Sequence, residues 1–468
     1  MAFTSLSFLG FVLAVVLVVN AVKTPRTRAW LMLPANLVFL ASYVGRPIEL
    51  VPLLGFGALG YGFIELLRRT RSSAWLWFGL LVVVGTFVTL KKYAFVPAAF
   101  TLPGIYSVIG LSYVLFRVLH LMVDAKQGEL TGRVDPLSYI NYTASFLTLV
   151  AGPIQRFKEF ERETGAVRPL EEAEVYAAFA RIIQGFLRIA VVSAAFDYVF
   201  AALSPRVLPA AVALPWPQLV GYYAASAVSY TVFLYANFAG YMDVVVGVGA
   251  LLGQKLPENF DHPFQARSFL DFWARWHITL STWFRMYVFN PLLRVLATHV
   301  SSAALAPYLA VVAFFITFLL MGVWHGATSV FVVYGLYMGA GASVNKLWQL
   351  QAAKRLGKAR YKALGEKPLA IYVSRGLTFA YFALGLSCLW LSLSELAALS
   401  SRLGVGGWLL CYLGLTGSAA LGFAAWDGAG SVLTKLRNQR GWESGAMGRN
   451  LLLAAQILMI SCISSFFH

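Results

Sequence analysis

The chain has 468 residues, of which 59% are hydrophobic and only 12% are charged. Soluble proteins average about 25% charged residues, so this composition excludes an ordinary soluble enzyme. Apolar segments long enough to cross a bilayer recur along the sequence and predict a polytopic, all-α membrane protein surrounded by membrane lipids. The net charge of +17 does not indicate a nucleic-acid partner, because the basic residues gather in short loops between apolar segments.

The apolar segments define the candidate spans, some of which are too short to cross alone. They are residues 4–22, 29–45, 49–67, 74–92, 103–123, 138–153, 176–203, 218–236, 238–253, 305–323, 328–348, 370–394, 403–425 and 450–467. We expect about eleven to thirteen crossings plus re-entrant pieces, in one transmembrane domain over residues 1–468. The first segment lacks a basic region and a convincing cleavage site, so we expect a retained span rather than a signal peptide.

The basic loops predict the orientation. Basic residues follow the first and third segments, precede residue 176, and recur over 354–367 and 435–449. Placing these loops in the cytoplasm gives an even alternation with both termini outside the cytoplasm. Lys91 and Lys92 fall on the outer side in this scheme, where long side chains can reach the interface from a helix end. The charged, helix-forming stretch over residues 155–175 is expected to lie along the inner surface.

The three cysteines do not indicate a metal site. Cys388, Cys411 and Cys462 all lie in apolar segments, and their spacing matches no metal-binding pattern. We expect them to pack in the core, and we expect no metal.

Polar and aromatic residues concentrate in a central stretch over residues 256–291, between two apolar regions. Pro257 and Pro263 predict a break, because proline cannot continue a helix. A helix is expected to begin after Ser268 as N-cap, with Asp271 in its first turn and paired with Arg275 one turn later.

Two patterns follow from continuing that helix. Phe269, Phe272, Trp273 and Trp276 recur at three- and four-residue spacing and predict an aromatic face. The second pattern is one stripe at four-residue steps, formed by Trp273, His277, Ser281 and Arg285. The stretch is either a functional region inside the helix bundle or an amphipathic interfacial helix with a tryptophan belt.

A further histidine ends the apolar run over residues 305–323. His325 follows Trp324 and precedes Gly326. A histidine at membrane depth either makes an interhelical hydrogen bond or marks a functional site. Burial keeps an imidazole neutral, and a neutral imidazole can act as a general base. Gly326 is expected to leave room for a substrate beside it.

A polar cluster precedes the central stretch and is formed by Tyr235, Asn237, Gly240, Tyr241 and Asp243. A carboxylate at membrane depth needs a partner, and an arginine of the central stretch is the expected one. We favour a structural role for this pair.

The motifs together resemble the membrane-bound O-acyltransferase family. In chain order they are LKKYAF, GLSYVLFRVLHLMVD, VAGPIQRF, FAGYMD, LPENFDHPF, DFWARWHITLSTWFR, MGVWHG and YGLYMG, over about residues 90–345. The resemblance is closest to the bacterial branch that contains the alginate O-acetyltransferase membrane subunit and the D-alanyl transfer protein of teichoic acid modification. It implies helices around a central tunnel, in the bacterial inner membrane.

The resemblance also implies roles for single residues. His325 corresponds to the catalytic histidine of the family, and His277 to a second histidine of the bacterial branch. We expect substrate-binding roles for Trp273, Trp276, Ser281, Arg285, Trp324 and Asn259. Family members commonly carry an acid directly after the motif arginine, where this chain has Met286.

The implied activity moves an acetyl or other short acyl group from a cytoplasmic thioester to a hydroxyl on the outer side. The expected donor is acetyl-CoA, with no bound cofactor, and the expected outer partner is an extracytoplasmic acetyltransferase or a polysaccharide acceptor. The alternatives are D-alanyl-type transfer from an acyl carrier protein to an envelope polymer, acylation of lipid hydroxyls, and a transporter without catalysis. General-base catalysis by His325 and an acyl-histidine relay both remain open.

Overall fold

A computed structural model describes residues 5–102, 106, 108–130, 132–207, 214–300, 302, 304–440 and 452–460. These residues form helices, and an isolated antiparallel bridge between Phe260 and Trp276 is the β-type pairing among them. The predicted all-α class is therefore confirmed. The chain divides into two compact units, Met1–Gly185 with Tyr241–Glu258, and Phe186–Gly240 with Asn259–His468.

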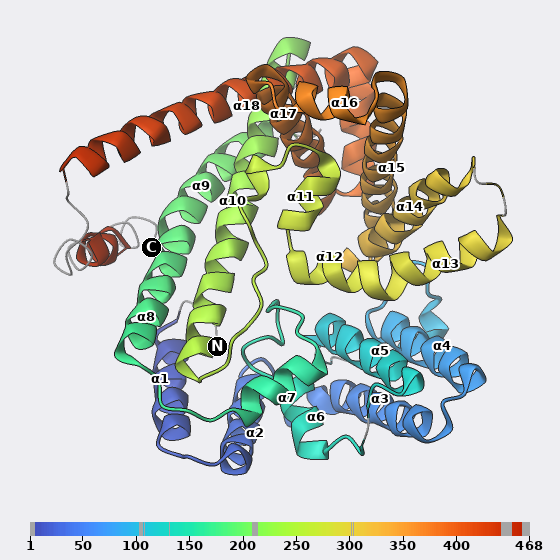
Figure 1. Ribbon diagram of the computed structural model, residues 1–468, viewed down its shortest axis with the longest axis vertical. Coiled ribbons are helices and arrows are strands. Elements are labelled where there is room, and N and C mark those ends of the chain that lie inside the picture. Colours follow the sequence, from blue (N-terminus) through green and yellow to red (C-terminus); the bar gives the residue numbers. More distant parts are fainter. Residues whose placement is uncertain are drawn as a thin grey trace. The chain divides into compact units, whose positions relative to one another are not determined.

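The first unit takes its helices mainly from the N-terminal part of the chain. They are α1 (Leu6–Asn20), α2 (Pro25–Ala41), η1 (Pro47–Leu50), α3 (Val51–Thr70), α4 (Ser73–Leu90), η2 (Ala98–Phe100), α5 (Leu111–Gln127), α6 (Pro136–Thr143), α7 (Phe157–Gly165) and most of α8 (Glu172–Leu187). Helices α3, α4 and α5 pack side by side (Figure 1). The last part of α10 (Trp216–Leu251) also belongs to this unit.

The second unit contains the rest of α10 and the C-terminal helices. They are η3 (Arg188–Ser193), α9 (Ala194–Leu203), η4 (Ser204–Arg206), η5 (Pro263–Gln265), α11 (Phe269–Arg275), α12 (Ile278–Phe284), η6 (Arg285–Phe289), α13 (Asn290–His299), α14 (Ala306–His325), α15 (Val330–Leu356), α16 (Lys358–Gly365), α17 (Pro368–Gly385), η7 (Leu386–Leu389) and α18 (Leu393–Arg440). Helix α18 contains a kink at Gly404, whose φ of 58° lies in the left-handed region.

Seven helices within the described residues are long and apolar enough to cross a membrane. They are Pro47–Thr70, Ser73–Leu90, Glu172–Arg206, Trp216–Leu251, Ala306–His325, Pro368–Leu389 and Leu393–Val432. Only 6% of the apolar window in Glu172–Arg206 is buried inside the protein, as expected for a helix that faces lipid. The chain is a polytopic membrane protein, with fewer such helices than the crossings expected from the sequence.

Three segments account for part of this difference. Residues 218–236 and 238–253, expected as two spans, form the single continuous helix α10. In the expected span 138–153, the helix is limited to the last part of the eight-residue α6, and irregular backbone follows it. Helix α5 begins at Leu111 rather than near residue 103, and it buries Arg117 and His120, which lowers its hydropathy. The last expected span, 450–467, lies mostly outside the described residues.

Two of the cysteines can be checked against the core prediction. Cys388 and Cys411 are free thiols and both are buried, so the predicted packing role is confirmed for them. Cys462 lies outside the described residues.

Candidate functional site

The central stretch begins as the sequence predicts. Helix α10 ends at Leu251, and irregular backbone with the short 3-10 helix η5 connects it through the two prolines to α11. Ser268 caps α11, because the Asp271 backbone N–H donates to its Oγ at 3.1 Å. The Arg275 Nε donates to Asp271 Oδ1 at 2.9 Å. The predicted cap and ion pair are both confirmed, since each depends only on neighbours along one helical turn.

The helix then stops two residues before His277. Trp276 is extended (φ −105°, ψ 126°), and His277 has left-handed backbone angles (φ 45°, ψ 54°) before α12 begins. The predicted single stripe from residue 273 to residue 285 is therefore wrong. The cause is tertiary, because the Ile278 N–H donates to Asn259 O at 2.9 Å and the Asp261 N–H donates to Arg275 O at 3.0 Å. These bonds use backbone groups that a continuous helix would need.

Asn259 occupies the position of a helix cap. Its Oδ1 accepts from the Thr279 backbone N–H at 3.1 Å and from the Thr279 hydroxyl at 2.7 Å. Asn259 is 1% exposed. The side chain expected to bind substrate thus satisfies an N–H in the first turn of α12, 20 residues later in the chain.

His277 is buried and faces an aromatic ring. It is 5% exposed, and its ring meets Phe238 edge-on with 4.9 Å between centroids. Its Nδ1 has no hydrogen-bond partner among the described residues. Burial, together with the nearby His325, lowers the pKa of His277, which lies outside the seven apolar helices, to about 3. This places a neutral imidazole with one unused nitrogen within electrostatic reach of His325.

His325 ends α14 and is partly exposed. Its ring lies 4.8 Å from the Trp324 ring and 5.5 Å from the Tyr334 ring of α15, measured between centroids. Helices α14 and α15 approach closely here, since a Cβ added at Gly322 would lie 2.2 Å from the Cα of Gly335. The close contact of Gly322 with Gly335 therefore allows Tyr334 of α15 to pack against His325.

Gly326 serves packing rather than substrate access. A Cβ at this position would lie 2.0 Å from the Phe331 ring. The space beside Gly326 is already filled, so the expectation that it is left open for a substrate is wrong.

A cavity of about 310 Å³ lies between α11, α12, η6 and α14. Three of the expected substrate-binding residues line it, namely Trp273, Ser281 and Arg285. The buried Nε1 of Trp273 has no hydrogen-bond partner among the described residues. Met321 also lines the cavity and precedes His325 by one helical turn. Three of the expected residues therefore lie at one cavity. The α14 side of this cavity ends at Met321, one helical turn before His325.

The other expected residues lie outside this lining. Trp276 is 5% exposed and packs in an aromatic cluster, with its ring centroid 5.4 Å from Phe272 and 4.8 Å from Phe382 of α17. The predicted aromatic face of the central stretch is present, and it is buried against α17.

Arg375 of α17 supports this region and was not identified from the sequence. Its Nε donates to Phe264 O at 3.0 Å, and its Nη1 donates to Asp427 Oδ2 at 2.5 Å. The Phe264 ring in turn contacts Trp276 at 6.4 Å between centroids. An arginine inside the apolar segment 370–394 was the available signal.

The polar cluster of α10 is divided between the units. Tyr235 belongs to the second unit and packs on Phe264 at 4.9 Å between centroids. Asp243 belongs to the first unit, where its Oδ1 accepts from the Nε of Arg181 at 3.2 Å. Arg181 also contacts Glu258 at 2.5 Å. The arginine partner therefore comes from α8, and the expectation of a partner from the central stretch is wrong.

No group of three or more His, Cys, Asp or Glu within the described part of the chain could hold a metal ion.

The sequence profile of the membrane-bound O-acyltransferase family matches residues 111–365, more than half of the chain. A protein described as a "probable alginate O-acetylase" from Pseudomonas fluorescens is 29% identical over 372 residues, which cover 76% of this chain and 68% of that protein. A teichoic acid D-alanyltransferase from Bacillus subtilis is 31% identical over 238 residues, 50% of this chain and 58% of that protein. One from Streptococcus thermophilus is 30% identical over 308 residues, 64% of this chain and 71% of that protein.

Proposed function

Because the chain belongs to the membrane-bound O-acyltransferase family, we propose that it transfers an acetyl group from cytoplasmic acetyl-CoA across the membrane to a hydroxyl acceptor. The acceptor would be an extracytoplasmic polysaccharide, reached directly or through an extracytoplasmic acetyltransferase. The similarity to the alginate O-acetylase favours this version, since it extends over 76% of the chain, against 50% and 64% for the two D-alanyltransferases.

The second candidate is D-alanyl-type transfer from an acyl carrier protein to a cell-envelope polymer. The names of the relatives support both versions at about the same identity. In either version the chain lies in the bacterial inner membrane with its basic loops toward the cytoplasm.

His325 carries the proposed mechanism. Its imidazole accepts the proton of the acceptor hydroxyl as that oxygen attacks the thioester carbonyl. The tetrahedral intermediate then expels the thiolate, which receives the proton back from His325. In an acyl-histidine relay the acyl group passes first to His325 and then to the hydroxyl. The observation that supports this role is the partly exposed His325 beside the buried, neutral His277 with its unpaired Nδ1.

The test is thioester turnover by purified protein in vesicles supplied with labelled acetyl-CoA. We expect His325→Ala to lower turnover by at least about 10²-fold, the usual size of a general-base contribution. His299→Ala is the matched control, because this histidine is exposed at the end of α13. Retained turnover in a folded, inserted His325→Ala protein would exclude both forms of the mechanism.

The donor decides between the two candidates. If acetyl-CoA is not consumed, the same vesicles are supplied with an acyl carrier protein charged with D-alanine. Turnover of that thioester alone would establish the second candidate. Movement of a solute without loss of any thioester would indicate a transporter.

A further inference from the structure

Helix α16 and the residues on either side of it form a strongly basic surface in the second unit. Residues 354–367 contain six basic residues and one acid, Glu366, a net charge of +5 out of +17 for the whole chain. All six basic side chains are exposed, namely Lys354, Arg355, Lys358, Arg360, Lys362 and Lys367. These six residues are called the α16 surface below.

The fold keeps the α16 surface small. Gly357, with a φ of 78° that favours glycine, ends α15 and turns the chain into α16. Helix α16 has eight residues, a length of about 12 Å, and it contacts both α15 and α17 (Figure 1). Its two partly buried residues, Tyr361 and Leu364, lie three residues apart on the face toward the protein. The basic side chains of this short helix therefore lie together at its exposed sides.

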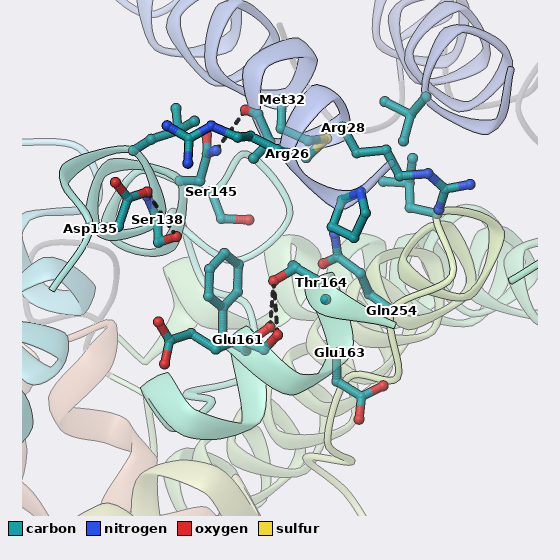
Figure 2. A pocket seen from close by; sticks show the side chains of 18 residues that line it. Arg26, Arg28, Met32, Asp135, Ser138, Ser145, Glu161, Glu163, Thr164 and Gln254 are labelled. Carbon is teal, nitrogen blue, oxygen red and sulfur yellow. Dashed lines mark hydrogen bonds between the residues drawn. The ribbon is translucent and has the colours of Figure 1, made fainter. Parts of the chain in front are cut away.

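The basic residues of the first unit, in contrast, lie beside acids. Three near α7 lie within 3.0 Å of a glutamate carboxylate, namely Lys158 with Glu129, Arg162 with Glu163 and Arg168 with Glu174. Two arginines line a cavity together with three acids, as Figure 2 shows for Arg26, Arg28, Asp135, Glu161 and Glu163.

The α16 surface has no such compensation. Within the described part of the chain, none of its six residues forms an ion pair. The positive-inside rule accounts for basic residues in loops, but it does not require them to stay without acids. The charge of the α16 surface is therefore available to a partner outside this chain.

Exposed apolar side chains place the α16 surface at the boundary of a membrane. Helix α17 is one of the seven apolar helices and begins directly after Lys367. Leu369 in its first turn is 78% exposed, and Trp348 of α15, six residues before Lys354, is 65% exposed. Both helices thus carry an exposed apolar side chain next to the basic residues. This order is typical of helix ends at the level of the lipid headgroups.

We propose that the α16 surface binds the phosphate groups of anionic membrane lipids, with Trp348 and Leu369 against the acyl chains. Clusters of four to eight basic residues at the membrane end of a helix attract anionic lipids, with a gain in affinity of about fivefold per residue. The exposed apolar side chains favour a lipid surface over an acidic soluble protein, because a lipid covers charged and apolar groups at once.

The experiment is native mass spectrometry of the full chain in detergent. The protein is offered equal amounts of phosphatidylglycerol, which is anionic, and phosphatidylcholine, which is zwitterionic, with the same acyl chains. We expect the wild type to retain phosphatidylglycerol in preference to phosphatidylcholine. This preference should be lost as the ionic strength rises from about 0.1 M to about 1 M, because the screening length falls from about 10 Å to about 3 Å.

The variants test the α16 surface directly. The charge-removing variant carries Lys358→Gln, Arg360→Gln and Lys362→Gln together. At about fivefold per residue, we expect it to bind phosphatidylglycerol about 10²-fold more weakly than the wild type. A second variant, with Lys358→Arg, Arg360→Lys and Lys362→Arg, keeps the three charges and should bind as the wild type does.

The matched control removes three charges from the first unit, through Lys158→Gln, Arg162→Gln and Arg168→Gln. These side chains are also exposed, but each already has a glutamate partner. The control should retain phosphatidylglycerol as the wild type does, although its net charge equals that of the charge-removing variant.

Three results would overturn the proposal. Equal retention of phosphatidylglycerol by the charge-removing variant and the wild type would leave the α16 surface only a role in membrane orientation. An equal loss in that variant and in the control would mean that only the net charge matters. Unchanged lipid retention with lost binding of an acidic acyl carrier protein would assign the surface to a protein partner. Thermal midpoints equal to that of the wild type show that the variants are folded, and the salt dependence tests the proposal without any variant.

Discussion

At the scale of single residues, the backbone of His277 distinguishes it from an ordinary buried histidine. Left-handed angles in a residue with a side chain cost about 1–2 kcal/mol. Such strain persists where the surrounding structure enforces it, and here the pairing of residues 259–261 with residues 275–278 does so. The strained backbone turns the chain between two short helices and leaves the imidazole buried.

Replacing His277 with glycine tests the role of the imidazole separately from the role of the backbone conformation. Glycine adopts left-handed angles without cost. We therefore expect His277→Gly to insert, and we expect any fall in its melting temperature to come only from the lost packing of the imidazole ring. We expect acyl transfer to fall by about 10²-fold, because the second imidazole is gone. Thermal melting and turnover are measured on the same preparation. Full activity in His277→Gly would mean that this position supplies only the shape of the turn.

At this scale, the sequence predicted some contacts of the expected site residues and missed others. The cap at Ser268 and the pair of Asp271 with Arg275 were predictable, because both depend on three- or four-residue spacing within one helix. The position of Asn259 against Thr279 was not, since no local pattern shows which distant segment caps a helix. The functional roles of His325 and His277 stay predictions until turnover is measured.

At the scale of elements, the contact between α14 and α15 fixes where His325 lies. Gly322 meets Gly335, and Gly335 in turn lies so close to α14 that a Cβ there would be 2.6 Å from Leu319 O. These contacts are between backbones, which cannot rotate away as a flexible side chain can. Small residues at such contacts let membrane helices approach closely.

An alanine at Gly322 should therefore push the two helices apart. We expect Gly322→Ala to lower stability by about 1–3 kcal/mol, the usual cost of overpacking, and to lower turnover by displacing His325. Gly414→Ala is the control, because the corresponding Cβ in α18 meets nothing within 4 Å. That control should be neutral or slightly stabilising, since alanine favours helix more than glycine does. Equal melting and turnover of the two variants would contradict the role of the α14–α15 contact.

At the scale of the whole molecule, the sequence predicts an orientation that the seven apolar helices do not fix by themselves. Cysteine labelling tests it, because Cys388 and Cys411 are buried and Cys462 can be changed to serine. In that background we expect Phe95→Cys to react with a membrane-impermeant maleimide in intact cells. Phe95 is 63% exposed and lies on the predicted outer side.

The complementary position is Arg360 in the basic helix α16, which is also exposed. Arg360→Cys should react only after the cells are permeabilised, because basic loops remain on the cytoplasmic side. The reverse pattern, with Arg360→Cys labelled in intact cells, would contradict the predicted orientation.

The sequence by itself determined the membrane class, the break at the two prolines, the local cap and ion pair, and the ordered motifs of the family. Each depends on composition or on neighbours within a few residues, where the physical forces are local. Only the tertiary structure decided that the central helix breaks at Trp276 and His277, that Asp243 pairs with Arg181, and that Gly326 packs on Phe331. These outcomes depend on contacts between segments distant in the chain, whose approach is set by packing and by the need to pair buried polar groups.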